Sequence, residues 1–310
     1  MQQDGEKMKT KSVIILSLFL MGFACDQNTS RPDHRIQVAA SILPLQDFVN
    51  QIGGQEVTSF VVIPPGASPH TFELVPTMLR KINNSQILVL NGLGLEPWSA
   101  RVIDTVGEEK LKVIVTSREI NALATETSHH HQHGEHSHDH PESGNPHVWL
   151  DPVLAIKQVE QIAAGFASAF PAHADSFLAR RDRYKARLLQ LDQEIQVKVR
   201  SWSHRDFVCF HPAWEYFAHR YGLNQAAVIT DRPGMEPSPA RMAHVIETLN
   251  RTGAKAVFSE PQFSESLLRA IAEEANVSVV QLDPLGTTLE NGGYIELMQY
   301  NVAKIESALK

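Results

Sequence analysis

A long stretch without glycine or proline most constrains how this chain can fold. Residues 174–202 contain neither residue, and their apolar side chains recur at a spacing near 3.6, which predicts one amphipathic helix. At about 1.5 Å per residue, this helix would be roughly 40 Å long, which is more than a small domain needs. A further helix is predicted over residues 153–170, with Pro152 at its first position. The long helix is therefore a candidate rigid connector between two parts of the chain.

Short apolar runs alternate with helical patterns on both sides of this helical region, which indicates two parallel sheets. Before it, strands are expected at residues 36–41, 57–63, 87–90 and 112–116, and helices at 44–52, 75–83 and 96–106. After it, strands are expected at residues 207–210, 226–229, 256–259 and 278–282, and helices at 212–221, 239–250, 264–275 and 294–309. The predicted fold is α/β, with two lobes that each hold a parallel sheet flanked by helices and are joined by one long rigid helix.

The first 25 residues have the pattern of an export signal. Three lysines precede an apolar run at residues 12–24, which is roughly 20 Å long as a helix and too short for a bilayer core of about 30 Å. The small residues before Cys25 resemble a bacterial lipoprotein cleavage box, with Cys25 as the lipid-carrying residue. Ordinary cleavage nearby is the alternative, and a start at Met8 would give a more typical signal.

These patterns divide the chain into five segments. The predicted order is a lipoprotein-type signal peptide at residues 1–25, a flexible tether at 26–35, the N-terminal lobe at 36–152, connecting helices at 153–203 and the C-terminal lobe at 204–310. Apart from Cys25, Cys209 is the only cysteine in the sequence, so the exported domain would depend on its hydrophobic cores and not on disulfides. The net charge of −7, without a basic stripe, argues against nucleic-acid binding.

Residues 117–146 form a polar loop that is rich in histidine. Its histidines are His129, His130, His131, His133, His136, His138 and His140. Neutral imidazole is the commonest protein ligand for zinc, copper and nickel, and this composition is typical of a solvated metal-binding loop. A polar insert without a metal role is the alternative. A purification tag fits less well, because the run is internal and interrupted by other residues.

Three further histidines and an aspartate occur where predicted strands end or where the loop returns to regular structure. They are His70, His147, His211 and Asp283. Ligands of open α/β sheets bind beyond the carboxyl ends of strands, and three imidazoles with one carboxylate complete a tetrahedral shell for Zn²⁺. Each residue alone could be an ordinary polar group, but their joint placement predicts a metal site in the cleft between the lobes. Glu260, after another strand, is a candidate for orienting an imidazole, with a salt-bridging or capping role as the alternative.

Seven motifs are similar to those of the metal-binding lipoproteins of bacterial ABC importers, the cluster A-I solute-binding proteins for zinc and manganese. They are residues 69–73 (PHTFE), 91–98 (NGLGLEPW), 145–152 (NPHVWLDP), 210–217 (FHPAWEYF), 236–239 (EPSP), 260–263 (EPQF) and 282–286 (LDPLG). The resemblance extends from about residue 37 to the C-terminus. It implies two α/β lobes joined by one long helix, and the family's ligand positions fall on His70, His147, His211 and Asp283.

The resemblance also implies a metal and a role. Manganese-specific members carry Glu at the position of His211, and a third imidazole favours Zn²⁺ over the harder Mn²⁺. The expected protein is not an enzyme. It is expected to be a monomer in the periplasm or on the outer face of the cytoplasmic membrane, attached by its lipid anchor. Its expected function is to capture Zn²⁺ at one tight site and to deliver it to an ABC permease. Further weak sites are expected in the His-rich loop.

Three alternative functions remain open at this point. The nearest is a manganese or broad-specificity component of the same importer class. A zinc hydrolase is remote, because the His-Glu-x-x-His motif is absent from the sequence and four protein ligands leave no open position on the metal. A surface adhesin on the same scaffold is the third, although the sequence offers no specific feature for it.

Overall fold

The computed structural model describes residues 35–310, apart from residues 108, 125–143, 231–234, 264 and 290–291. The predicted signal peptide with Cys25, nearly all of the tether, and the histidines from His129 to His140 lie outside the described residues. Within the part that is described, no helix combines the length and the apolar character needed to cross a membrane.

The first lobe is built on a parallel four-stranded sheet. Its strands are β1 (Ile36–Ala40), β2 (Val57–Val61), β3 (Ile87–Leu90) and β4 (Lys112–Val115), in the order β2-β1-β3-β4. The helices that follow the first three strands are α1 (Leu43–Gly53), α2 (Pro76–Asn83) and α3 (Ser99–Val106). Alternate strand residues face opposite sides, so Val38 packs in the core with α1, whereas Ala39 packs in the core with α2 and α3.

The second lobe repeats this arrangement. Its strands are β5 (Asp206–Cys209), β6 (Asn224–Val228), β7 (Ala256–Ser259) and β8 (Ser278–Gln281), all parallel and in the order β6-β5-β7-β8. Its helices are α6 (Glu215–Tyr221), α7 (Pro239–Thr252), α8 (Glu265–Ala275) and α9 (Tyr294–Leu309). Val208 and Val257 pack toward α7 and α8, while Phe207 and Phe258 pack on the face that α6 and α9 cover. The predicted pair of parallel sheets is therefore confirmed.

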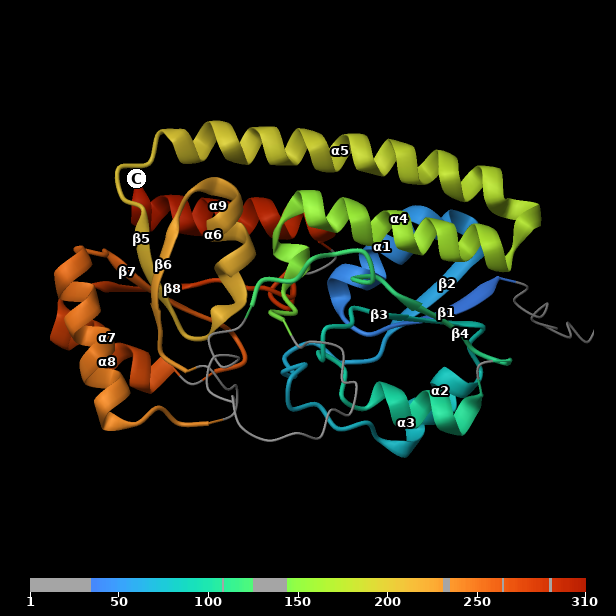
Figure 1. Ribbon diagram of the computed structural model, residues 1–310, viewed down its shortest axis with the longest axis horizontal. Helices are drawn as coiled ribbons and strands as arrows, with labels where there is room; N and C mark the ends of the chain where they lie inside the picture. The colour runs from blue at the N-terminus through green and yellow to red at the C-terminus, as the bar shows by residue number, and fades with distance from the viewer. Residues whose placement is uncertain (1–34, 108, 125–143, 231–234, 264, 290–291) are drawn as a thin grey trace, which may run out of the picture. The chain divides into compact units, whose positions relative to one another are not determined.

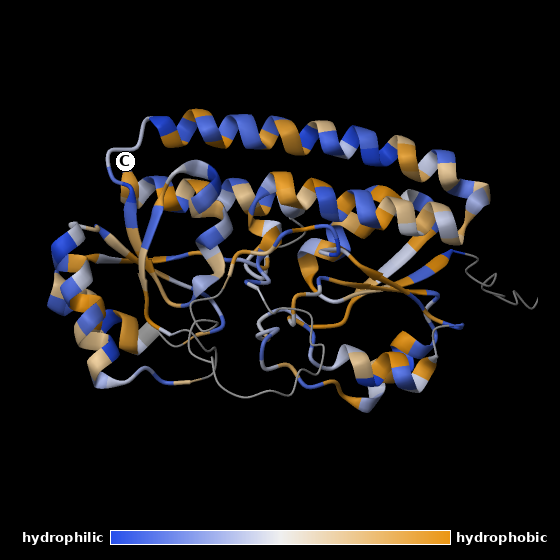
Figure 2. Cartoon of the chain, in the orientation of Figure 1, coloured by the Kyte–Doolittle hydropathy of each residue, from blue (hydrophilic) through white to orange (hydrophobic). Residues whose placement is uncertain are grey.

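Two helices connect the lobes: α4 (Pro152–Ala169) and α5 (Ala174–Arg200). The 27 residues of α5 form one uninterrupted helix that packs against α1 and α4 of the first half and against α6 and α9 of the second (Figure 1). The prediction of one long helix between two α/β lobes is confirmed, and the helix ends two residues before the predicted position. Its side chains are mixed in character, whereas the strands are largely hydrophobic (Figure 2).

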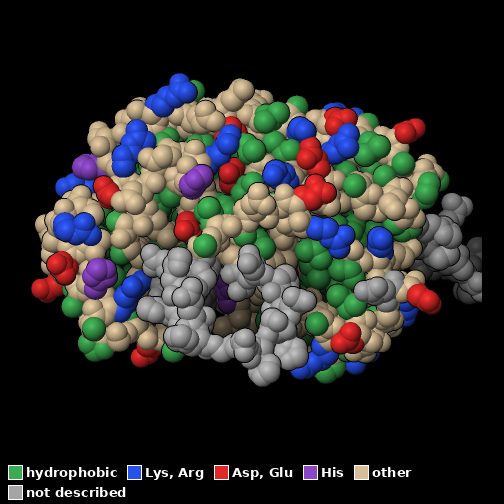
Figure 3. Space-filling model, viewed as in Figure 1, with side chains coloured by type: hydrophobic (Ala, Val, Ile, Leu, Met, Phe, Trp, Pro, Cys, Tyr) green, Lys and Arg blue, Asp and Glu red, His purple; other side chains and the backbone are tan. Residues whose placement is uncertain are grey.

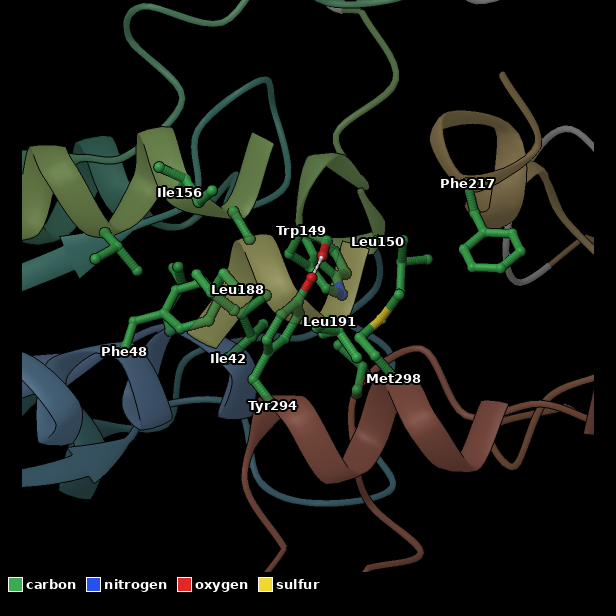
Figure 4. Packing of buried hydrophobic residues seen from close by; sticks show 14 of the residues in the cluster. Ile42, Phe48, Trp149, Leu150, Ile156, Leu188, Leu191, Phe217, Tyr294 and Met298 are labelled. Atoms are coloured by element: carbon green, nitrogen blue, oxygen red, sulfur yellow. Dashed lines mark hydrogen bonds between the residues drawn. The ribbon is translucent and has the colours of Figure 1, made fainter. Parts of the chain in front are cut away.

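The hydrophobic core is continuous between the two lobes. One cluster of buried residues includes Val38 of the first sheet, Phe258 of the second, and side chains from α1, α4, α5 and α9. Figure 4 shows where these helices meet, with Tyr294 of α9 beside Trp149. The Tyr294 hydroxyl donates to the carbonyl oxygen of Trp149 at 2.6 Å, which satisfies a polar group that would otherwise be buried alone.

The helix predicted at residues 96–106 begins three residues late, at Ser99. The buried carboxylate of Glu96 accepts hydrogen bonds from the Ser41 hydroxyl at 2.6 Å and from the backbone N–H groups of Asn91 and Gly92 at 2.8 and 3.0 Å. These bonds tie Glu96 to the turn after β3, where Gly92 has a φ of 90° that favours glycine. Residue 96 is therefore part of this turn and not of the helix.

Candidate metal centre

Three segments that are distant in sequence bring His70, His147 and His211 together. His70 lies in the loop after β2, His147 immediately before the 3₁₀ turn Val148–Leu150 that leads into α4, and His211 two residues after β5. His147 and His211 are buried, with 4% and 2% of their surfaces exposed, and His70 is half-buried. The carboxyl ends of β2 and β5 therefore contribute one imidazole each, as the topology of parallel sheets predicts.

The three imidazoles have the spacing of metal ligands. Nε2 of His147 lies 3.1 Å from Nε2 of His70 and 3.1 Å from Nε2 of His211, and the three ligand atoms lie within 4.8 Å of one another. Two nitrogens bound to one tetrahedral zinc at about 2.05 Å would be roughly 3.3 Å apart. The three histidines line a cavity of about 10 Å³. Figure 3 shows histidine atoms at the floor of a recess. The spacing and the size suit a single ion.

Hydrogen bonds on the far side of two rings define which nitrogen faces this cavity. Nδ1 of His147 lies 2.7 Å from the side-chain oxygen of Asn145, and Nδ1 of His211 contacts the fully buried carboxylate of Glu260. Both partners are acceptors, so each Nδ1 carries a proton, and Nε2 is the nitrogen of each ring that faces the cavity. Ring nitrogens that converge on one small cavity can bind a cation placed between them, and so this arrangement suits a metal ion.

Burial keeps two of these rings in the form that binds metal. Burial first, and then the positive charge that His211 can carry, together lower the pKa of His70 from 6.5 to about 3. Burial also lowers the pKa of His147 well below its ordinary value, with His211 and then His70 as additional causes. Both imidazoles are therefore neutral at neutral pH, as metal ligation requires.

The structure places Asp283 outside this group of three. Its buried carboxylate accepts hydrogen bonds from the backbone N–H groups of Leu285, Gly286 and Thr288, at 2.7 to 3.0 Å, and from the hydroxyls of Thr287 and Thr288, at 3.1 and 2.9 Å. All five donors belong to its own loop. Asp283 as a fourth ligand therefore stays a prediction.

Asn145 and Trp149 are not among the predicted site residues, although both belong to the motif at residues 145–152. Asn145 supports His147 through its side chain, and the indole of Trp149 donates to the carbonyl of Pro284 at 2.7 Å, which links the His147 segment to the Asp283 loop. An amide side chain two residues before an expected ligand is a usable signal. The partner of Trp149 is 135 residues away, and no local pattern indicates it.

A pair of α/β lobes with histidines meeting between the ends of their strands defines a two-lobed metal-binding protein. The sequence family described as the periplasmic component A of the zinc-uptake complex matches residues 38–308, and this chain belongs to that family. The family is a component of an uptake complex, which supports the prediction of a binding protein and not an enzyme.

The curated relatives include zinc-binding proteins of streptococci. The chain is 28% identical over 306 residues to the zinc-binding lipoprotein AdcA of Streptococcus pneumoniae R6, which covers 96% of this chain and 61% of the relative. It is 27% identical over 290 residues to the zinc-binding protein AdcA of Streptococcus pyogenes serotype M1, covering 90% of this chain and 56% of the relative. The chain therefore spans about 60% of the length of these relatives.

Solved structures of similar proteins share the fold over most of this chain. A crystal structure of ZnuA is 30% identical with a TM-score of 0.78 and covers 88% of this chain and 99% of its own. A ZnuA deletion mutant with zinc bound is 29% identical with a TM-score of 0.76, at 89% and 98% coverage. Zinc-bound AdcA of Streptococcus pneumoniae is 26% identical with a TM-score of 0.74, at 89% and 58% coverage.

Proposed function

We propose that this protein captures Zn²⁺ outside the cytoplasm and delivers it to an ABC permease. The observation that carries the proposal is the set of three Nε2 atoms around one small cavity, with neighbouring atoms 3.1 Å apart. Two of the similar solved structures contain zinc, and the chain's own family is named for zinc uptake. The described cluster consists of imidazole nitrogens, which suit Zn²⁺ better than Mn²⁺, a metal that prefers oxygen ligands.

The location that we propose is the periplasm or the outer face of the cytoplasmic membrane. The family is described as periplasmic, and one relative is named a lipoprotein, which supports export and attachment through a lipid on Cys25. A component of an uptake complex also requires a partner in the membrane, and an ABC permease fits that role. The protein would meet this permease as a monomer.

The His-rich loop has an accessory role in this proposal. Its histidines would bind further zinc weakly. Because the loop is attached to the lobe, the effective concentration of this zinc at the cleft would be on the order of millimolar. The base of this loop is closed by a backbone hydrogen bond of 2.9 Å from the N–H of Asn145 to the carbonyl of Leu123. Removing residues 127–143 therefore leaves a short connection between two points that are already paired.

Two variants distinguish zinc binding at the cleft histidines from zinc binding in the His-rich loop. His211→Ala removes one buried imidazole and should abolish most of the tight zinc binding, whereas deletion of residues 127–143 should leave the tight site and remove only weak additional binding. His219→Ala, at an exposed position on α6, is the matched control. The measurements are the zinc content of protein purified without added metal and competition titrations with Zn²⁺, Mn²⁺ and Cu²⁺.

The reverse pattern would contradict the proposal. If the deletion removed tight binding and His211→Ala did not, the tight site would lie in the loop. If the purified protein carried manganese and preferred it in competition, the protein would be the manganese component that the sequence leaves as its nearest alternative.

A further inference from the structure

Asn145 makes hydrogen bonds on both sides of its side chain. The oxygen accepts from the backbone N–H of His147 at 3.0 Å and faces Nδ1 of the same residue at 2.7 Å. The amide nitrogen donates to the carbonyl of Pro212 at 2.7 Å and to the carboxylate of Glu215 at 2.8 Å. The residue is 1% exposed, so these four contacts use the hydrogen-bonding capacity of a fully buried amide.

These contacts determine which side of the amide carries the oxygen and which carries the nitrogen. The backbone N–H of His147 can only donate, and the carbonyl of Pro212 can only accept. Exchanging the amide oxygen and nitrogen would therefore place donor against donor on one side and acceptor against acceptor on the other. The oxygen must face His147, and Nδ1 of His147 must then carry the proton. The lone pair of the neutral ring is left on Nε2, inside the metal cavity.

The same amide connects the two segments that supply His147 and His211. Pro212 directly follows His211, and it is 67 residues from Asn145 in sequence. One side chain thus contacts the first ligand on one side and the residue next to the second ligand on the other. This short path joins the two segments whose Nε2 atoms lie 3.1 Å apart.

Tyr216 holds the backbone of the same junction. Its hydroxyl donates to the carbonyl of Asn145 at 2.7 Å and accepts from the N–H of Leu123 at 3.0 Å. At Gly144, a β-carbon would lie 2.3 Å from that of Ala122, so only glycine fits where the chain approaches Asn145. The position of Asn145 is therefore set by contacts with α6 of the second lobe and with residues 122–123 of the first.

We propose that Asn145 is a positioning residue for zinc capture: from its anchorage on the second lobe, it fixes the Nδ1–H tautomer of His147 and sets the Nε2 of that ring against the Nε2 of His211 before metal arrives. This inference rests on the proposed function, because it assumes that the three histidines bind zinc. Preformed ligand geometry increases affinity, since less ordering remains to be done on binding.

The test uses Asn145→Ala and Asn145→Asp in the full chain, with Asn250→Ala, at an exposed position on α7, as the control. Correlation spectra of the ¹⁵N-labelled imidazoles report the tautomer of His147 in zinc-free protein, and competition titration reports the zinc Kd. We expect Nδ1–H in the wild type, loss of that preference in Asn145→Ala, and zinc binding about 10- to 100-fold weaker in Asn145→Ala. Asn145→Asp should keep the tautomer, because a carboxylate still accepts both N–H groups of His147, but it should also weaken zinc binding, because its other oxygen would face the acceptors of Pro212 and Glu215.

Two results would overturn the inference: an Nε2–H tautomer of His147 in the wild type, or unchanged tautomer and zinc affinity in Asn145→Ala. If Asn145→Ala does not fold, the wild-type and Asn145→Asp spectra still decide. Failure of the proposed function has a different signature, which is a zinc Kd that does not respond to His211→Ala. The tautomer is measured without zinc, so it tests the role of Asn145 independently of zinc binding.

Discussion

His70 and His147 differ from exposed histidines in their affinity for protons. An ordinary histidine loses zinc to protons below about pH 6.5. Burial lowers the pKa of His70 to about 3 and that of His147 well below 6.5, so protons compete for these two rings only at lower pH. The same shift has a consequence for the stability of the zinc-free protein, because the unfolded chain recovers ordinary histidines.

The zinc-free protein should lose stability as the pH falls from about 7 to about 5. Between a folded pKa of about 3 and an unfolded pKa of 6.5, the unfolded chain binds a proton at His70 that the folded chain does not. The free energy of unfolding therefore decreases as the pH is lowered through this range. In His70→Asn, the decrease in melting temperature over this range should be smaller than in the wild type. Calorimetry with a chelator present measures it, and His219→Asn is the exposed control. An identical pH dependence in His70→Asn would show that His70 titrates normally.

At the scale of the elements, two helices meet at one buried carboxylate, and the start of a third is connected to them through an arginine. Asp192 of α5 accepts two hydrogen bonds from the guanidinium of Arg220 on α6, at 2.9 and 2.7 Å, and one from the hydroxyl of Tyr221 at 3.1 Å. The same guanidinium lies 3.7 Å from Asp151, whose side chain caps the start of α4 by accepting from the N–H of Val153. The segment after His147 is thus tied to the long helix through charged side chains.

Arg220→Ala should destabilise the protein by about 2 kcal/mol, because Asp192 would remain buried without its cation. The full effect for a completely buried pair is larger, but the Arg220 side chain is 29% exposed and solvent screens part of the interaction. Chemical denaturation measures the free energy of unfolding, and Arg183→Ala, at an exposed position on α5, is the control. Equal stabilities of the two variants would show that water replaces the guanidinium without loss.

At the scale of the whole described chain, the two sheets share one hydrophobic core along α5 and α9. Two independent cores would let each lobe unfold by itself, whereas a shared core makes the lobes depend on one another. Helix α4 also contributes to this core and begins shortly after His147, so it connects the core with the metal centre. Packing around α5 therefore supports both lobes and the approach to the site.

Leu188→Ala should destabilise the protein by about 3 kcal/mol and lower the stability of both lobes in one transition. Leu188 is fully buried in the shared core, whereas its neighbour Leu189 is 42% exposed, so Leu189→Ala is a control at the adjacent position of the same helix. Thermal unfolding followed by calorimetry and by tryptophan fluorescence tests this. Two separated transitions in the variant would contradict a single cooperative core.

Local patterns in the sequence were sufficient to predict the order of the elements, the long helix and the three histidines that lie close together. Helical periodicity and the absence of glycine and proline are properties of neighbouring residues, and α5 follows them closely. The histidines could be found because parallel strands bring their carboxyl ends to one edge, so a position after a strand already implies a position in space.

The hydrogen bonds around those histidines depend on packing and could not be read from local patterns. The partner of His211 is Glu260, 49 residues away, and Asn145 reaches Pro212, 67 residues away. The sequence predicts Asp283 as a metal ligand together with the three histidines. In the structure, its carboxylate accepts five hydrogen bonds from the loop that follows it. A side chain's residue type and its place after a strand are local properties, but the direction in which it points depends on which distant groups the folded chain brings within hydrogen-bonding distance.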